Sequence, residues 1–166
     1  MPSSPLKPPP VELLDKFHGP DFLPLYTTTV TASGGEANHG RASGEVRSDD
    51  GNLAVSLRLP PELDGPGGGT NPEQLFAAGY AACFHGVLCL LANRLEIPVQ
   101  DVVVRVSVAF GRDPVDGLFM LTADVRVHLH GIEKHVAEEL LRGAERACPY
   151  TKLAQQGMQS TVALAS

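Results

Sequence analysis

The chain has 166 residues, which is enough for one domain with a buried core. Its 13 basic and 19 acidic side chains give a net charge of −6, which argues against nucleic acid or an anionic membrane as the main partner. Three cysteines are too few, and odd in number, for a secreted scaffold held together by disulfides.

Residues 1–22 are rich in proline and are predicted to form an N-terminal extension that docks by its apolar residues, ahead of one domain over 23–166. No signal-peptide pattern is visible, and the absence of arginine before Arg41 argues against a mitochondrial transit peptide. The longest apolar run, residues 81–92, is interrupted by a histidine and is too short to span a bilayer. We therefore expect a soluble, cytoplasmic protein.

Three strands are predicted before the first long helix. Residues 25–32 are rich in β-branched side chains, 41–47 form a second candidate, and 53–59 alternate apolar and polar residues. Asp50-Gly51 is typical of a hairpin turn between the last two. The proline- and glycine-rich segment 60–69 then connects the strands to the helix.

The helix is predicted to begin at a capping signal. Thr70 or Asn71 can serve as N-cap, and Pro72 suits the first helical position. With Asn71 as the cap, Gln74 falls at the third position, which resembles a capping box.

The body of this helix is almost free of charge. Between Glu73 and Arg94 there is no charged residue, and a helix that is apolar on all sides is expected to be buried. Cys83, near its middle, is therefore expected deep in the fold.

The second half of the chain repeats the alternation of hairpin and helix. The predicted elements are two strands, a helix stopped by Pro149, a short helix and a closing strand, over 102–110, 118–129, 132–147, 150–156 and 160–165. Runs of hairpins separated by helices indicate an α+β fold rather than a doubly wound α/β sheet.

Two thiols stand at positions that define elements. Cys83 lies mid-helix and Cys148 directly precedes Pro149, and the residues alone leave open whether the pair is inert or chemical. His85 follows Cys83 by two positions, about 200° around a helix, so it is a poor general base for that thiol. Cys89 is interpreted as a small buried hydrophobe.

A metal site is a weaker alternative. His128, His130 and His135, with Glu133, carry possible ligands, but no H-E-x-x-H or C-x-x-C motif accompanies them. Ordinary surface histidines are the favoured interpretation, and no metal is expected.

Two segments resemble the signature sequences of the organic hydroperoxide resistance proteins, a branch of the OsmC-like family. They are N-P-E-Q-L-F-A-A-G-Y-A-A-C-F at 71–84 and C-P-Y-T at 148–151, and the resemblance extends from about Leu25 to the C-terminus. It implies an intertwined homodimer in which antiparallel sheets wrap central helices, with active sites at the subunit interface.

The resemblance also implies a thiol peroxidase that reduces organic hydroperoxides to alcohols. Cys83 would be the peroxidatic cysteine, Cys148 the resolving one and Glu73 the carboxylate of the site. The reductant would be a dihydrolipoyl-type dithiol on a lipoylated protein, with no bound cofactor. Aromatic residues are expected to line the substrate entry: Phe76, Tyr80, Phe84 and Tyr150.

The arginine of the site departs from the family pattern. The family places it in Gly-Gly-Arg, whereas here Gly34-Gly35 is followed by Glu36. Arg41 is our candidate, held by two-point pairing with Glu73, and Arg47 is the alternative. Arg41 would stabilise the Cys83 thiolate and the leaving oxyanion.

Helix geometry predicts how the site is shared. Glu73 and Cys83 are ten residues apart, so a straight helix separates them by about 15 Å along its axis and about 80° around it. We therefore expect two copies of the helix to run antiparallel, so that each site mixes residues of both chains.

The rival hypothesis to a peroxidase is a non-catalytic dimer of the same fold that binds a small molecule or lipid.

Overall fold

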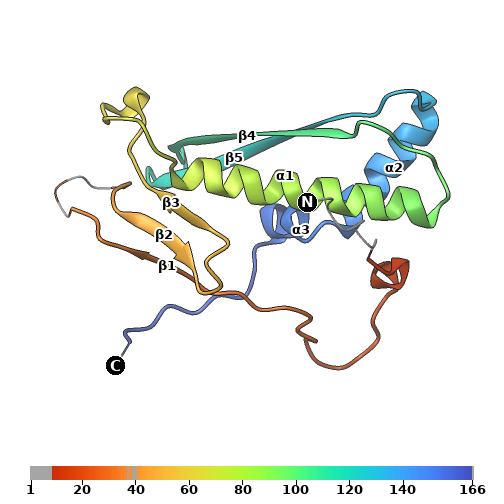
Figure 1. The fold of residues 1–166 in the computed structure, drawn as a ribbon, viewed down its shortest axis with the longest axis horizontal. Helices are drawn as coiled ribbons and strands as arrows, with labels where there is room; N and C mark the ends of the chain where they lie inside the picture. Colours follow the sequence, from red (N-terminus) through yellow and green to blue (C-terminus); the bar gives the residue numbers. More distant parts are fainter. Residues whose placement is uncertain (1–8, 37, 39–40, 166) are drawn as a thin grey trace, which may run out of the picture. The chain divides into compact units, whose positions relative to one another are not determined.

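The computed structural model describes residues 9–36, 38 and 41–165, and its elements follow the predicted order up to the last helix (Figure 1). Antiparallel sheets combine with helices, which confirms the α+β class. The elements are η1 (Val11–Leu14), β1 (Val30–Ser33), β2 (Glu45–Ser48), β3 (Ala54–Ser56), η3 (Pro61–Leu63), α1 (Pro72–Arg94), β4 (Val103–Arg112), β5 (Phe119–His128), α2 (Lys134–Ala147) and α3 (Pro149–Gln156).

The chain folds into two compact units. The sheet unit comprises residues 17–77 and 108–121. The helical unit comprises the described residues before Phe17, together with 78–107 and 122–165. Because α1, β4 and β5 each pass from one unit into the other, neither unit is a separate stretch of sequence.

The sheet unit contains the antiparallel sheet β1-β2-β3. Its strands are shorter than predicted, and β2 begins at Glu45 rather than at Arg41. The reason lies at Gly44, whose φ of 80° only glycine adopts readily and whose Cα faces the Ser33 carbonyl too closely for a side chain. A small core stabilises the sheet through Ala42, Val46 and Leu57, with Val55, Leu59 and Leu75 packed against them.

α1 begins with the predicted cap. The Asn71 side-chain oxygen accepts a hydrogen bond from the Gln74 backbone N–H at 2.9 Å, and Pro72 occupies the first helical position. The Thr70 hydroxyl adds a 2.8 Å hydrogen bond to the Gln74 side chain. The cap therefore fixes where this helix starts.

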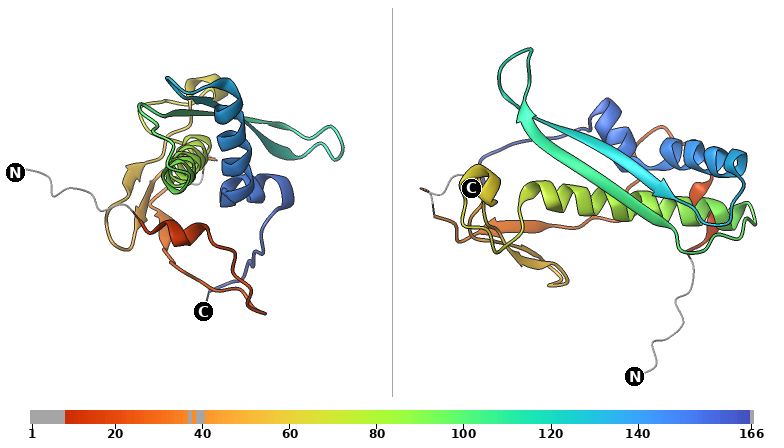
Figure 2. Two further views of the ribbon diagram at one scale, coloured as in Figure 1. Left: turned by 90° about the vertical axis from the view of Figure 1, so that its right-hand side faces the viewer. Right: turned by 90° about the horizontal axis from the view of Figure 1, so that it is seen from above.

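The body of α1 is less buried than its composition predicts. Within the single chain only one stripe is buried, formed by Tyr80, Phe84, Leu88 and Ala92. Seen along its axis in Figure 2, α1 has α2 and α3 on one side. The opposite face exposes Ala78, Ala82 and Gly86. The expectation that Cys83 lies deep in the fold is therefore wrong for one chain, because the thiol flanks the buried stripe and is half-buried.

α1 is longer than its most apolar part. Residues 81–92 alone are too short to span a bilayer, but the whole helix, 23 residues long, has the length and composition to do so. A core helix of a soluble protein has the same properties. Length and composition therefore do not decide between these two environments.

The predicted closing strand does not form. Residues 157–165 follow α3 as an extended segment outside any strand of the described chain (Figure 1), and Val162 and Leu164 are almost fully exposed. Alternating apolar residues give a segment strand propensity, but a strand also needs a neighbouring edge to bond with.

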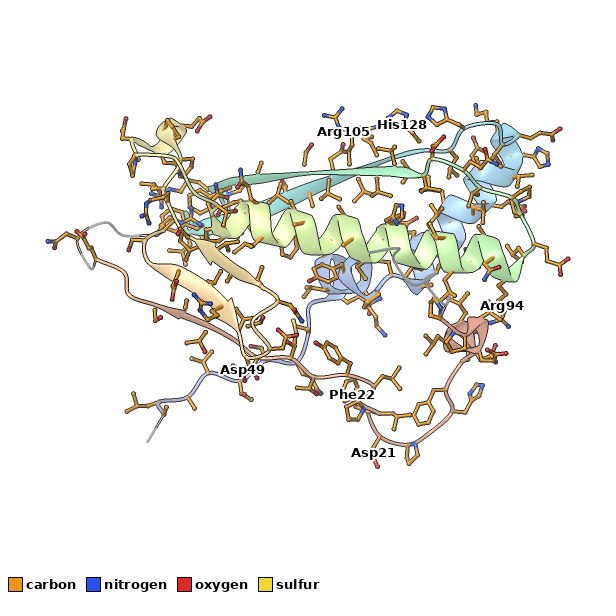
Figure 3. The ribbon with its side chains drawn as sticks, in the orientation of Figure 1. Asp21, Phe22, Asp49, Arg94, Arg105 and His128 are labelled. Carbon is orange, nitrogen blue, oxygen red and sulfur yellow. The ribbon has the colours of Figure 1, made fainter. Side chains whose placement is uncertain are left out.

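The N-terminal extension contains the expected helical turn, as η1. Val11 and Leu14 are half-buried, and Asp15 forms a 2.7 Å ion pair with Arg94. Arg94 is labelled near the end of α1 in Figure 3. Residues 1–8 of the extension lie outside the described residues.

Substituting the N-cap tests how α1 is anchored. Asn71→Ala removes the side-chain acceptor for the Gln74 N–H and should lower the free energy of unfolding by about 1 kcal/mol. Chemical denaturation of purified protein measures this. Asn93→Ala, at an exposed position of the same helix, is the matched control and should change stability by less than about 0.5 kcal/mol. Equal losses in the two variants would contradict the capping role.

Candidate active site

The structure brings the two predicted thiols together in the helical unit. The Sγ atoms of Cys83 and Cys148 lie 3.9 Å apart. Cys148 is fully buried and Cys83 half-buried. Because a disulfide bond is about 2.05 Å long, closing it needs a movement of only about 2 Å.

Cys148 owes its position to the junction of two helices. It ends α2 by donating its backbone N–H to the Ala144 carbonyl at 2.8 Å, and its own carbonyl accepts from the Lys152 N–H at 3.1 Å in α3. Pro149 cannot continue α2 but is favourable at the first position of α3. The side chain continues the buried stripe of α2 formed by Leu140 and Ala144.

The surroundings of Cys83 disfavour its thiolate. Burial raises its pKa to about 11, and the neighbouring Cys148 contributes further to the rise. A hydrogen bond from the backbone N–H of Tyr150, in the first turn of α3, lowers the pKa of Cys83 and so offsets part of this rise. With these groups alone the sulfur is a thiol at neutral pH, so a reactive thiolate requires a cation.

The sheet unit holds the predicted arginine in an ion pair. Nη2 of Arg41 contacts Oε1 of Glu73, which is one of the two hydrogen bonds expected from two-point pairing. The guanidinium also lies 3.6 Å from the ring centroid of Phe110 in β4, a cation–π contact. Residues His39 and Gly40, which directly precede Arg41 in the sequence, lie outside the described residues.

Arg47 has different surroundings. It is on β2, more than half exposed, and its partner is Glu45 at 3.4 Å on the same strand. Of the two arginines, Arg41 is thus the one that contacts the predicted carboxylate.

The four aromatic residues expected at the substrate entry have diverse environments. Phe84 is buried, and Tyr150 stacks on Tyr80 with centroids 5.8 Å apart. Tyr80 is buried as well, and its hydroxyl hydrogen-bonds the hydroxyl of Thr151. Phe76 belongs to the sheet unit and is half-buried. Their role in binding substrate stays a prediction.

Sequence reasoning missed Phe110 and Thr151. Phe110 lies in a strand whose alternating pattern assigns it a face but no partner. Thr151 is the fourth residue of the C-P-Y-T segment, and its burial (4% exposed) could not be read from that segment.

The remaining thiol differs from its expected environment. Cys89 is half-buried rather than buried, with its sulfur 3.8 Å from Nδ1 of His85, one turn earlier on α1. Burial raises the pKa of this thiol.

The histidines do not assemble a metal site in the part of the chain that the structure describes, where no group of three or more possible ligands gathers. His128 is exposed on β5 (Figure 3), and His135 pairs with Glu133 at 3.3 Å.

Comparison with known proteins identifies the family. Residues 65–163 match the family model described as OsmC-like protein. The chain belongs to the OsmC-like family. Its relatives include the organic hydroperoxide resistance protein of Xanthomonas axonopodis pv. citri, 39% identical over 144 residues that cover 85% of this chain and 95% of that protein. OhrB of Bacillus subtilis is 38% identical over 130 residues, covering 78% and 90%.

Solved structures of OsmC-like proteins have the same fold. An organic hydroperoxide resistance protein from Legionella pneumophila aligns with a TM-score of 0.72 and 40% identity, over 81% of this chain and 93% of that one. The structure of OhrB of B. subtilis aligns with a TM-score of 0.68 and 37% identity, over 80% and 93%. Similarity to several organic hydroperoxide resistance proteins supports a role in organic hydroperoxide resistance.

Oxidation of the purified protein tests the thiol pair. Mild oxidation should join Cys83 to Cys148, because their sulfurs are already 3.9 Å apart, with loss of two hydrogen atoms in the intact mass. Cys89→Ser should still form this bond, whereas Cys83→Ser and Cys148→Ser should not. Peptide mapping that finds Cys89 in the main disulfide would contradict the pairing.

Proposed function

We propose that this protein is a cysteine-based peroxidase that reduces alkyl or lipid hydroperoxides to alcohols. The observation that carries the proposal is the pair of thiols 3.9 Å apart, in a chain of the organic hydroperoxide resistance branch. A second thiol within reach of a peroxidatic thiol allows its sulfenic acid to form a disulfide before further oxidation. We further propose that it acts in the cytoplasm.

In the first step the Cys83 thiolate attacks the terminal oxygen of the hydroperoxide. The O–O bond breaks, the sulfur becomes a sulfenic acid, and the alkoxide takes a proton and leaves as the alcohol. Arg41 supplies the positive charge that favours the thiolate and the leaving alkoxide. Glu73 holds the guanidinium through the ion pair described above, and Phe110 supports its flat face.

In the second step the Cys148 sulfur attacks the sulfenic sulfur. A disulfide forms, the S–O bond breaks, and the hydroxide leaves with the thiol proton as water. A dithiol of the dihydrolipoyl type, carried on a lipoylated protein, then reduces the disulfide and becomes oxidised itself.

We propose that the four residues meet in a homodimer. α1 is continuous from Pro72 to Arg94, so Glu73 and Cys83 are separated along it by about 15 Å. The small residues Ala78, Ala82 and Gly86 leave one face of the helix open to close approach by another helix. Antiparallel packing of two copies on this face brings Glu73 of each chain towards Cys83 of the other.

The alternative is a dimer of the same fold that binds a small molecule or lipid without turnover. It would follow if Arg41 did not reach Cys83. The irregular sequence around Arg41, where Glu36 stands after the two glycines, favours it.

Steady-state turnover separates the two functions. The wild type should consume cumene hydroperoxide with dihydrolipoamide as reductant, and Cys83→Ser should abolish this. Arg41→Met should lower kcat/KM by about 10²- to 10³-fold, because it removes the cation at the sulfur and the oxyanion.

The same variant should also show a changed pH dependence. Since the pKa of Cys83 is raised to about 11, the activity of Arg41→Met should increase with pH through the alkaline range, as more thiolate forms.

Arg47→Met is the matched control for this experiment. Arg47 lies on the same sheet but pairs with Glu45, so the variant should retain nearly full activity. Absence of turnover in the wild type would support the binding protein, and a large loss in Arg47→Met would transfer the role to Arg47.

Mixing two inactive variants tests whether the site is shared between chains. Cys83→Ser and Arg41→Met chains, unfolded and refolded together, should recover roughly a quarter of wild-type activity. Half of the dimers are then mixed, and each mixed dimer has one complete site of two. If each site belongs to one chain, no mixed dimer is complete and activity stays at the level of the separate variants.

A further inference from the structure

Two contacts join α1 to the start of α3 in the helical unit. One is the thiol pair Cys83–Cys148, and the other is a hydrogen bond of 3.0 Å between the hydroxyls of Tyr80 and Thr151. Tyr80 precedes Cys83 by three residues on α1, and Thr151 follows Cys148 by three at the start of α3. Residues three apart on a helix lie one turn apart on the same side, so the hydrogen bond runs beside the sulfurs.

The hydrogen bond is shielded from water. Tyr80 is 5% exposed and Thr151 4%, so neither hydroxyl can readily exchange its partner for solvent. Removing one hydroxyl would leave the other buried without this partner, which is costly. The bond therefore constrains the distance between α1 and the first turn of α3.

A glycine allows this close contact. A Cβ at Gly79 would lie 2.5 Å from the hydroxyl oxygen of Tyr150, closer than real atoms approach. Tyr150 in turn stacks on Tyr80 and donates its backbone N–H to the Cys83 sulfur. The first turn of α3 thus contacts α1 at Gly79, Tyr80 and Cys83.

We propose that Thr151 and Tyr80 are positioning residues for the resolving step. Their hydrogen bond keeps Cys148 within reach of the sulfenic acid on Cys83, so that the disulfide forms before a second hydroperoxide can react. This inference rests on the proposed peroxidase function and adds a role to Tyr80, which the sequence suggested only as an entry residue.

The sulfenic acid on Cys83 is a branch point between two products. The sulfenic acid either condenses with Cys148, releasing water, or reacts with another hydroperoxide to give a sulfinic acid and an alcohol. Both products arise from one intermediate, so their ratio does not depend on how fast that intermediate forms. A slower approach of Cys148 increases the sulfinic product.

Intact-mass measurement of this ratio is the test. Reduced full-length protein is treated with increasing cumene hydroperoxide in the absence of reductant, and the concentration that converts half of Cys83 to sulfinic acid is recorded. Tyr80→Phe and Thr151→Val should each lower this concentration by about two- to tenfold, the effect expected for one buried hydrogen bond. The double variant should be no worse than the more severe single variant, since both remove the same bond.

Two controls separate positioning from general loosening. Thr151→Ser keeps the hydroxyl and should behave as the wild type. Ser48→Ala removes a comparably buried hydroxyl, hydrogen-bonded to the Leu53 N–H in the sheet unit, and should leave the ratio unchanged. Thermal melts of every variant show whether it is folded. If Thr151→Val does not fold, Tyr80→Phe, which keeps the ring, tests the proposal alone.

The outcomes are distinct. Wild-type disulfide formation with unchanged ratios in Tyr80→Phe and Thr151→Val would overturn the positioning role and leave the peroxidase intact. An equal effect of Ser48→Ala would overturn it too. A wild type that forms neither disulfide nor sulfinic acid at Cys83 would instead overturn the proposed function.

Discussion

The contact between α1 and the first turn of α3 is the constraint on which the proposed chemistry of this protein depends. α3 can start where it does because Pro149 ends α2 and begins a new helix, with Cys148 at the junction. Gly79 gives Tyr150 room, and the buried Tyr80–Thr151 hydrogen bond ties the two elements together. The result is a pair of sulfurs that needs little movement to form a bond.

This close fit has an electrostatic consequence. Burial and the second thiol raise the pKa of Cys83, so the geometry that would favour resolution in the proposed mechanism disfavours the thiolate. One backbone N–H from α3 offsets part of this effect. The proposed site therefore needs a strong cation, and Arg41 is already oriented by a carboxylate and an aromatic ring in the sheet unit.

Two apolar surfaces of the single chain have the character of an interface. α1 exposes a face of small residues opposite its buried stripe, and the segment after α3 exposes Val162 and Leu164. In the proposed dimer the first surface packs against its own copy. A shared site would then couple dimer formation to activity, because neither chain alone would bring cation and thiol together.

The sequence by itself determined the order of the elements up to α3, the start of α1 and the family. These depend on local signals: the Asn71 cap, Pro149 and two long motifs, each of which acts through neighbouring residues. Only the tertiary structure decided that Cys83 is half-buried, that Phe110 contacts Arg41, and that Thr151 bonds Tyr80. It also decided that residues 160–165 form no strand in the described chain. Such features depend on residues far apart in sequence, and hydrophobic periodicity assigns a residue to a face without naming what packs there.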